Sequence, residues 1–260
     1  MLVSAEVGLR ERAETERSLS EARHTENLKI AEAQLRRYIA PPADTPYPLE
    51  YSFHLLANPR GQRVVDFGCG SGANSVLLAR RGANIVGIDI SEALLTLAKR
   101  RVEEHGYPNS ALFCAASAHQ LPLADASVDV VFGIAILHHL DIDVVRQEVL
   151  RILKTGGRAI FQEPVRESPM LRYVRRFLPW QDADVSPYEQ PLTAAAVKVL
   201  SRGFAARRIR AFVLPHVTLS QRLGAPDKFV HWCYRLDGRI LKWMPRLGRY
   251  ASIRVIELTK

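Results

Sequence analysis

A glycine-rich loop is the part of the sequence best suited to bind a ligand. In VVDFGCGSG, Gly68, Gly70 and Gly72 come directly after a β-branched run and just before a segment with helical spacing. Glycine permits a positive φ and lets a ligand approach the backbone without a Cβ in the way. The loop therefore predicts a binding site at a strand-to-helix turn.

Two carboxylates accompany this loop. Asp66 lies two positions before Gly68, and Asp89 lies at the end of the next apolar run, VGIDIS. A carboxylate at the end of a second strand can accept hydrogen bonds from both hydroxyls of a ribose, each worth roughly 1.5–3 kcal/mol. The Gly-x-Gly-x-Gly spacing differs from the dinucleotide fingerprint. Asp66 would also repel a pyrophosphate, whereas it suits a ligand that carries an amino group and a positively charged sulfur.

The elements that position these residues alternate between strands and helices. Strands are expected at 63–68, 83–90, 111–117, 128–137, 157–163, 204–213 and 252–260. Helices are expected at 72–81, 91–105, 143–154 and 193–204, and Gly156 is expected to end the third of them. Nearly continuous apolar strands in this alternation indicate a parallel sheet with helices on both faces.

The ends of the chain differ from this core. Residues 5–39 have amphipathic helical spacing, and four prolines follow between positions 41 and 48. We therefore expect a helical appendage with a proline-rich linker at 1–48 and the main domain at 49–260. Prolines and aromatic residues after position 165 indicate an insertion at 166–203, which we expect to form a lid over the substrate.

The composition is that of an ordinary globular protein. Of 260 residues, 47% are hydrophobic and 24% are charged, which excludes a disordered, collagen-like or disulfide-rich chain. No apolar run approaches the roughly 18 residues of a membrane span, and the first residues lack a signal core. Cys69, Cys114 and Cys233 are far apart and have no metal-ligand spacing. We therefore expect a cytoplasmic protein with reduced thiols and no metal.

The excess of positive over negative charge lies entirely in the last third of the chain. Residues 166–260 hold 18 Lys and Arg against 7 Asp and Glu, whereas residues 1–165 hold 18 against 20. Basic and aromatic residues are interleaved in YVRRFLPW and in HWCYRLDGRILKWMPRLGRY. Such segments pack as amphipathic helix faces, contact a membrane surface peripherally or stack on nucleic acid. Nucleic acid is the least favoured of the three, because no separate RNA-binding module is visible.

Residues 60–164 resemble the class I S-adenosylmethionine-dependent methyltransferases, especially the small-molecule group called type 11. The resemblance rests on VVDFGCGSG, VGIDIS, AHQLPLADASVDVVF, ILHHL and EVLRILKTGGRAIF, which occur in the family's order and spacing. It implies a Rossmann-like, seven-stranded, mostly parallel sheet whose last strand, SIRVIELTK, is antiparallel. It also implies S-adenosyl-L-methionine as the cofactor and a small molecule as the methyl acceptor.

The resemblance assigns roles to residues around the loop. It implies that Asp66 and the glycine backbone face the methionine part of the donor and that Asp89 holds the ribose. Where the family commonly has an acidic residue beside the adenine, this chain has Ser117, Ala118 and His119. The predicted cofactor-binding residues are Asp66, Gly68, Cys69, Gly70, Gly72, Asn74, Asp89, Ile90, Ser117, Ala118, His119 and Gly133.

His138, His139 and Glu163 are the candidate catalytic residues, because they follow the fourth and fifth strands at the edge where the acceptor should lie. Methyl transfer mainly requires alignment of donor and acceptor, and a base is needed only if the acceptor loses a proton. Structural roles for these side chains stay open, as do weaker candidates at Tyr188 and Glu189. Together, the residues predict a methyltransferase that acts on a small, apolar or lipid-like acceptor.

Oxygen is the first choice for the methylated atom, with nitrogen and carbon open. Two alternatives are a nicotinamide-nucleotide oxidoreductase, which the glycine spacing disfavours, and a non-catalytic binding protein with the same fold. We expect the N-terminal helix and the insertion to close over the donor.

Overall fold

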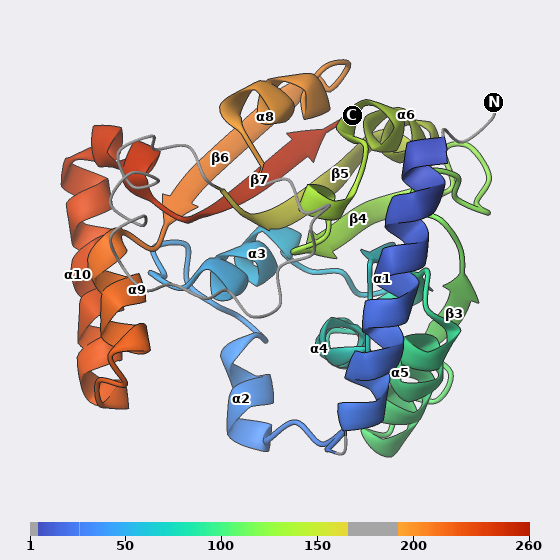
Figure 1. Cartoon of the computed structure of the whole chain (residues 1–260), viewed down its shortest axis with the longest axis horizontal. Coiled ribbons are helices and arrows are strands. Elements are labelled where there is room, and N and C mark those ends of the chain that lie inside the picture. Colours follow the sequence, from blue (N-terminus) through green and yellow to red (C-terminus); the bar gives the residue numbers. More distant parts are fainter. Residues whose placement is uncertain (1–4, 26, 166–191) are drawn as a thin grey trace.

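The computed structural model describes residues 5–25, 27–165 and 192–260. A seven-stranded sheet in the order β3-β2-β1-β4-β5-β7-β6 runs through the molecule (Figure 1). The strands are β1 (Arg63–Phe67), β2 (Asn84–Asp89), β3 (Ala111–Ala115), β4 (Val128–Ile134), β5 (Leu153–Pro164), β6 (Ala206–Phe212) and β7 (Ile253–Thr259). β1 to β5 pair in parallel, and β7 is antiparallel to both β5 and β6. The predicted fold class and the antiparallel last strand are confirmed.

The helices surround this sheet. They are α1 (Ala5–His24), α2 (Glu32–Arg37), α3 (Pro48–Leu56), α4 (Ala73–Arg80), α5 (Glu92–Glu104), α6 (Ile142–Ile152), α8 (Ala194–Leu200), α9 (Pro215–Arg222) and α10 (Asp227–Trp243). Short 3-10 helices cover Leu137–His139 and Pro245–Tyr250. Within the described ranges, no helix combines the length and the apolar character needed to cross a membrane.

Side chains alternate between two buried layers, which explains why the strands are apolar along their whole length. In β4, Val130 and Phe132 pack in the layer that includes α3 and α4, and Val131 packs in the opposite layer with α6. Phe53 of α3 and Val149 of α6 are fully buried in these two layers. Both faces of the central strands are therefore covered, as parallel sheets require.

The end of α6 differs from the prediction. The helix stops at Ile152, because Leu153 has an extended backbone and pairs with Val128 as the first residue of β5. Leu153 is fully buried, so its packing turns the chain into a strand before Gly156 is reached. The prediction that Gly156 ends this helix is wrong.

The N-terminal segment forms two helices instead of one helical stretch. α1 lies beside α5 and crosses the edge of the sheet where the parallel strands end (Figure 1). Between α1 and α2, Leu28 is buried, and Arg101 of α5 donates hydrogen bonds to the carbonyl of Leu28 and to Ser71 Oγ. The appendage thus packs on the domain.

Only part of the predicted lid can be described. Residues 166–191, with the candidates Tyr188 and Glu189 and the string YVRRFLPW, lie outside the described residues. The remainder contains α8, which begins at the N-cap Thr193 and packs against α6. Val197 and Leu200, on the inner face of α8, are buried. α8 therefore packs in the buried layer beside α6, and the lid role of residues 166–203 stays a prediction.

Candidate functional site

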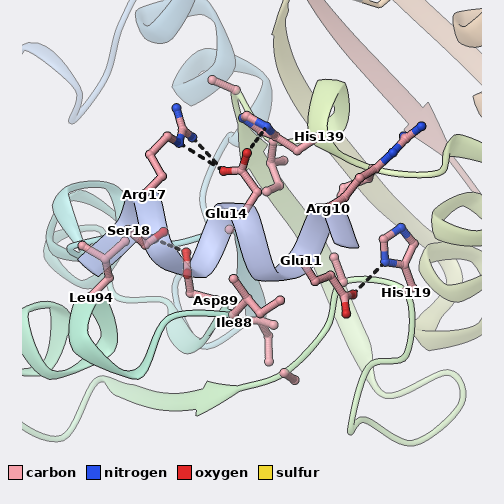
Figure 2. A pocket seen from close by; sticks show the side chains of 18 of the residues that line it. Arg10, Glu11, Glu14, Arg17, Ser18, Ile88, Asp89, Leu94, His119 and His139 are labelled. Carbon is pink, nitrogen blue, oxygen red and sulfur yellow. Dashed lines mark hydrogen bonds and ion pairs between the residues drawn. The ribbon is translucent and has the colours of Figure 1, made fainter. Parts of the chain in front are cut away.

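A cavity of about 200 Å³ lies at the carboxyl ends of the parallel strands and is covered by α1 (Figure 2). Gly68 follows β1, Asp89 ends β2, Ala116 follows β3 and Ala135 follows β4; all four line this cavity. Open α/β sheets bind ligands at this edge, where successive strand ends meet. The cavity is therefore the candidate functional site.

The glycine loop borders the cavity, but its glycines have different roles. Gly70 has a φ of +50°, and a Cβ built on it would meet no atom within 4 Å, so its side faces open space. Gly72 has a φ of +82°, and its Cβ would lie 2.7 Å from the Cα of Ala98 in α5. Gly70 therefore leaves room for a ligand, whereas Gly72 allows α4 and α5 to pack closely.

Asp89 projects into the cavity from the end of β2. Its Oδ2 accepts a hydrogen bond from the Gly70 N–H at 2.8 Å, and its Oδ1 accepts one from the Ser91 N–H at 2.9 Å. Burial raises the pKa of Asp89, although these backbone donors oppose the shift. The Ile90 N–H is a third backbone donor to this carboxylate. The backbone donors fix the carboxylate at the cavity, where it can also accept a ligand hydroxyl.

Asp66 lies behind the loop and is absent from the cavity lining. It is 1% exposed, and Ser75 Oγ in the first turn of α4 donates a hydrogen bond of 2.6 Å to its Oδ2. Burial, with a smaller effect from the charge of Asp89, raises the pKa of Asp66 to about 7. In this structure the side chain joins β1 to α4, and its predicted contact with the methionine part of a donor stays a prediction.

α1 contributes acidic side chains that the sequence analysis did not single out. Glu11 accepts hydrogen bonds from Ser117 Oγ and from His119 Nδ1, the latter at 3.1 Å (Figure 2). His119 Nε2 accepts the backbone N–H of Asp141 at 3.0 Å, so a neutral His119 carries its proton on Nδ1 and donates it to Glu11. A carboxylate therefore lies beside Ser117, where the chain's own loop has none.

A second acidic contact holds α1 near the end of β4. Glu14 Oε1 lies 3.2 Å from His139 Nδ1, and Arg17 lies 2.9 Å from the other oxygen of Glu14 (Figure 2). Burial favours the neutral form of Glu14, but its hydrogen bonds and charge interactions with His139 and Arg17 outweigh this effect and lower its pKa. The pair Arg17–Glu14 is local, but no pattern in α1 could have revealed the contact with His139, which is more than 100 residues away.

Glu163 and His138 form a buried pair next to the cavity. Glu163 is fully buried at the end of β5; its Oε1 accepts the N–H groups of Ile136 and Leu137, both at 2.9 Å. Its Oε2 accepts from His138 Nδ1 at 2.9 Å, which leaves the other ring nitrogen of His138 available as an acceptor. Both oxygens of Glu163 are thus occupied by the loop that it shapes.

His139 lies beside His138, with ring centroids 4.0 Å apart, and is the one of the three catalytic candidates that lines the cavity. Of the predicted cofactor-binding residues, the structure brings the following to the lining: Gly68, Gly70, Asp89, Ile90, Ala118 and His119. The remainder lie outside it: Asp66, Cys69, Gly72, Asn74, Ser117 and Gly133. Ser117 still contacts the site through Glu11, whereas Gly133 allows Phe161 to pack close to β4.

Comparisons with known proteins agree with this geometry. Residues 65–161 match the family model described as a methyltransferase domain. The methyltransferase GfsG of Streptomyces halstedii is 39% identical over 111 residues, 42% of this chain and 40% of that protein. The 27-O-demethylrifamycin SV methyltransferase of Amycolatopsis mediterranei is 36% identical over 100 residues, 38% of this chain and 37% of that protein. The chain therefore spans about two fifths of the length of these relatives.

A solved structure extends the likeness of fold beyond this core. Geranyl diphosphate C-methyltransferase from Streptomyces coelicolor, in complex with Mg²⁺, geranyl diphosphate and S-adenosyl-L-homocysteine, matches with a TM-score of 0.57 at 16% identity. The match covers 81% of this chain and 76% of that chain. The strands and helices described above are thus those of a class I methyltransferase fold.

Proposed function

We propose, from the premise that residues 65–161 form a class I S-adenosylmethionine-dependent methyltransferase domain, that the protein transfers a methyl group from S-adenosyl-L-methionine to a small-molecule acceptor. When bound, this cofactor supplies an electrophilic methyl group on a positively charged sulfur. The observation that carries the proposal is the convergence of Gly70, Asp89 and Glu11 on one cavity at the carboxyl ends of the strands.

The ribose and the adenine of the donor each have a matching carboxylate in this cavity. Asp89 would accept the ribose hydroxyls, and the open side of Gly70 gives the donor access to the loop backbone. Glu11, held by Ser117 and His119, would accept a hydrogen bond from the adenine amino group. In this proposal, a carboxylate from the N-terminal helix replaces the acidic residue that the family commonly has after the third strand.

The cavity under α1 is small for the proposed methyl donor. Small-molecule and cofactor sites usually enclose about 300–1,000 Å³, whereas this cavity encloses about 200 Å³. α1 covers it through contacts of Glu11 and Glu14 and is otherwise largely exposed. We therefore propose that α1 is displaced outward when the donor enters and then excludes water from the reaction.

The apolar lining beside His139 suits a methyl acceptor that is apolar and carries a hydroxyl group. Ile136 and Leu140 line the cavity beside His139, which would take the proton from an attacking hydroxyl group. His138 lies behind it, and we propose that Glu163 is a positioning residue for His138 and the loop after β4. Nitrogen and carbon acceptors stay open, and the identity of the methylated atom tests this assignment.

The first experiment is calorimetric titration of the purified protein with S-adenosyl-L-homocysteine, with NADH as the control. We expect micromolar binding of the former alone and at least tenfold weaker binding by Asp89→Ala, because both ribose contacts are lost. Asp125→Ala, on an exposed ion pair with Arg151, is the matched control. Unchanged affinity in Asp89→Ala would remove the donor assignment, and binding of NADH would favour an oxidoreductase.

The second experiment follows labelled methyl groups from the donor into fractionated cell extract. Label in small, extractable compounds supports the proposed acceptor class. Label in RNA or DNA would assign a nucleic acid acceptor, and donor binding without transfer to any fraction would favour the non-catalytic alternative.

A further inference from the structure

The outward side of α10 carries large apolar side chains that no part of the described chain covers. Trp232 is 52% exposed and Trp243 is 84% exposed, and Phe229 and Met244 are exposed beside them. The rings of Phe229 and Trp232 stack with centroids 5.6 Å apart. Single exposed apolar residues are ordinary, but several large ones along one side of a single helix indicate an interaction surface.

Basic side chains alternate with these aromatic rings. Lys228, Arg235, Arg239 and Lys242 are exposed and recur at helical spacing on the same side of α10 as the tryptophans, and Arg246 follows just beyond the helix. None of them forms an ion pair with another described residue. Between positions 228 and 249 the only acidic residue is Asp237, which is buried. The α10 side of this face is therefore aromatic and cationic. Two acidic residues, Asp44 in the segment before α3 and Glu50 in α3, line the same groove as three of these cations.

The orientation of α10 is fixed by its inner side. Asp237 accepts the backbone N–H groups of Val213 and Leu214 at 3.0 and 2.8 Å, where the chain leaves β6, and Cys233 is buried one turn earlier. Rotation of the helix would break these contacts. The two tryptophans must therefore point outward.

α9 packs against α10 and adds exposed apolar residues to this end of the molecule. They are Leu219 in α9 and Leu223 just after it. Both helices lie in the chain between β6 and β7, at the end of the molecule away from α1 and the cavity beneath it (Figure 1). The surface is thus separate from the candidate methyl-transfer site.

We propose that the α9–α10 face docks on the surface of an anionic lipid bilayer. Tryptophan and phenylalanine rings insert at the boundary between headgroups and acyl chains, while lysine and arginine bind anionic headgroups. A symmetric dimer would place Lys228, Arg235, Arg239 and Lys242 of one copy against the same cations of the other. These cations outnumber the exposed acidic residues nearby, such as Asp44, so net repulsion opposes self-association. Nucleic acid would use the cations but would leave the exposed leucines and Met244 without apolar partners.

Co-sedimentation of the whole protein with vesicles tests the proposal. We expect binding to vesicles of phosphatidylcholine mixed with phosphatidylglycerol, much weaker binding to phosphatidylcholine alone, and weakening with added salt, since exposed charges are screened. Replacing both tryptophans, Trp232→Ser with Trp243→Ser, should reduce binding at least about tenfold. Reversing two charges, Arg235→Glu with Arg239→Glu, should reduce it by more than about twentyfold, since each cation contributes about fivefold.

The control variant combines Leu112→Ser and Lys99→Glu, which change an exposed apolar residue and an exposed cation away from α10. It should bind vesicles like the unchanged protein, and circular dichroism should show that all variants are folded. Trp232→Phe with Trp243→Phe should keep most of the binding, which separates loss of the rings from loss of the fold.

Three results would overturn the proposal. The first is equal binding by the control and the α10 variants. The second is a dimer in light scattering that the tryptophan substitutions dissolve while vesicle binding is absent. The third is binding of RNA, but not of vesicles, that the charge reversals abolish.

Discussion

The buried carboxyl of Asp66 should make the stability of the protein depend on pH in an unusual direction. Its ordinary pKa of 3.8 is raised to about 7 in the folded chain, chiefly because the side chain is buried. Below about pH 3.8 the group is protonated in both the folded and the unfolded chain. Above about pH 7 it is ionised in both, and the folded chain carries the cost of a buried charge.

The stability that this group contributes is therefore fully present at acid pH and lost as the pH rises from about 3.8 to about 7. Each pKa unit corresponds to 1.36 kcal/mol, so a shift of roughly three units gives about 4 kcal/mol across this window. Asp66→Asn removes the ionisation and keeps an acceptor for Ser75 Oγ. The variant should thus match the unchanged protein near pH 4 and be more stable by up to about 4 kcal/mol above pH 7.

Urea unfolding of both proteins at a series of pH values measures this difference directly. Asp129→Asn is the matched control: burial alone would raise its pKa, but hydrogen bonds from Lys154 and the Arg63 N–H lower it. Its contribution should change in the opposite direction, being lost as the pH falls. A constant difference between Asp66→Asn and the unchanged protein across the window would refute the argument from burial.

Four further variants test the site. Gly70→Ala should lower the stability by only about 1–2 kcal/mol but block donor binding. Gly72→Ala should lower the stability by about 3 kcal/mol, because its Cβ also meets the α5 backbone. Urea unfolding measures the loss of stability, and calorimetry measures donor binding. Glu163→Gln should reduce turnover more than donor affinity. The amide oxygen can still accept the two backbone N–H groups, but the hydrogen bond with His138 changes. An unchanged rate would mean that the residue is purely structural. Glu11→Ala should weaken binding of S-adenosyl-L-homocysteine about tenfold, as loss of one charge-assisted bond implies; equal weakening by Glu16→Ala, on the exposed side of α1, would contradict the adenine assignment.

The strands and helices of the core could be predicted because their signals are local. The apolar run Val128–Ile134 needs no partner to be recognised as a buried strand, and Ser91 caps α5 as its type suggests. The end of α6 could not be predicted from Gly156, since the packing of Leu153 decides it. The roles of side chains are likewise predictable only where they depend on local sequence and not on distant partners.

Asp89 could be predicted from its place at the end of β2, where backbone spacing alone brings it to the cavity. The type and place of Glu163 predict an important residue, but its backbone partners lie in the loop after β4, so its spacing could not separate a positioning role from a catalytic one. Glu11 gave no signal at all. Its position in a charged helix resembles that of any solvated glutamate until Ser117 is folded beside it.

The distant attachment of α1 also has a consequence for how the chain folds. Glu11 and its partner Ser117 are separated by 106 residues, so docking of this helix closes a long loop. Among residues 8–24 only Ser18 is buried, which leaves little apolar area to stabilise the docked state. This helix is thus among the last elements of the described chain to dock during folding. Its amides should exchange hydrogen by local opening, well before the sheet unfolds.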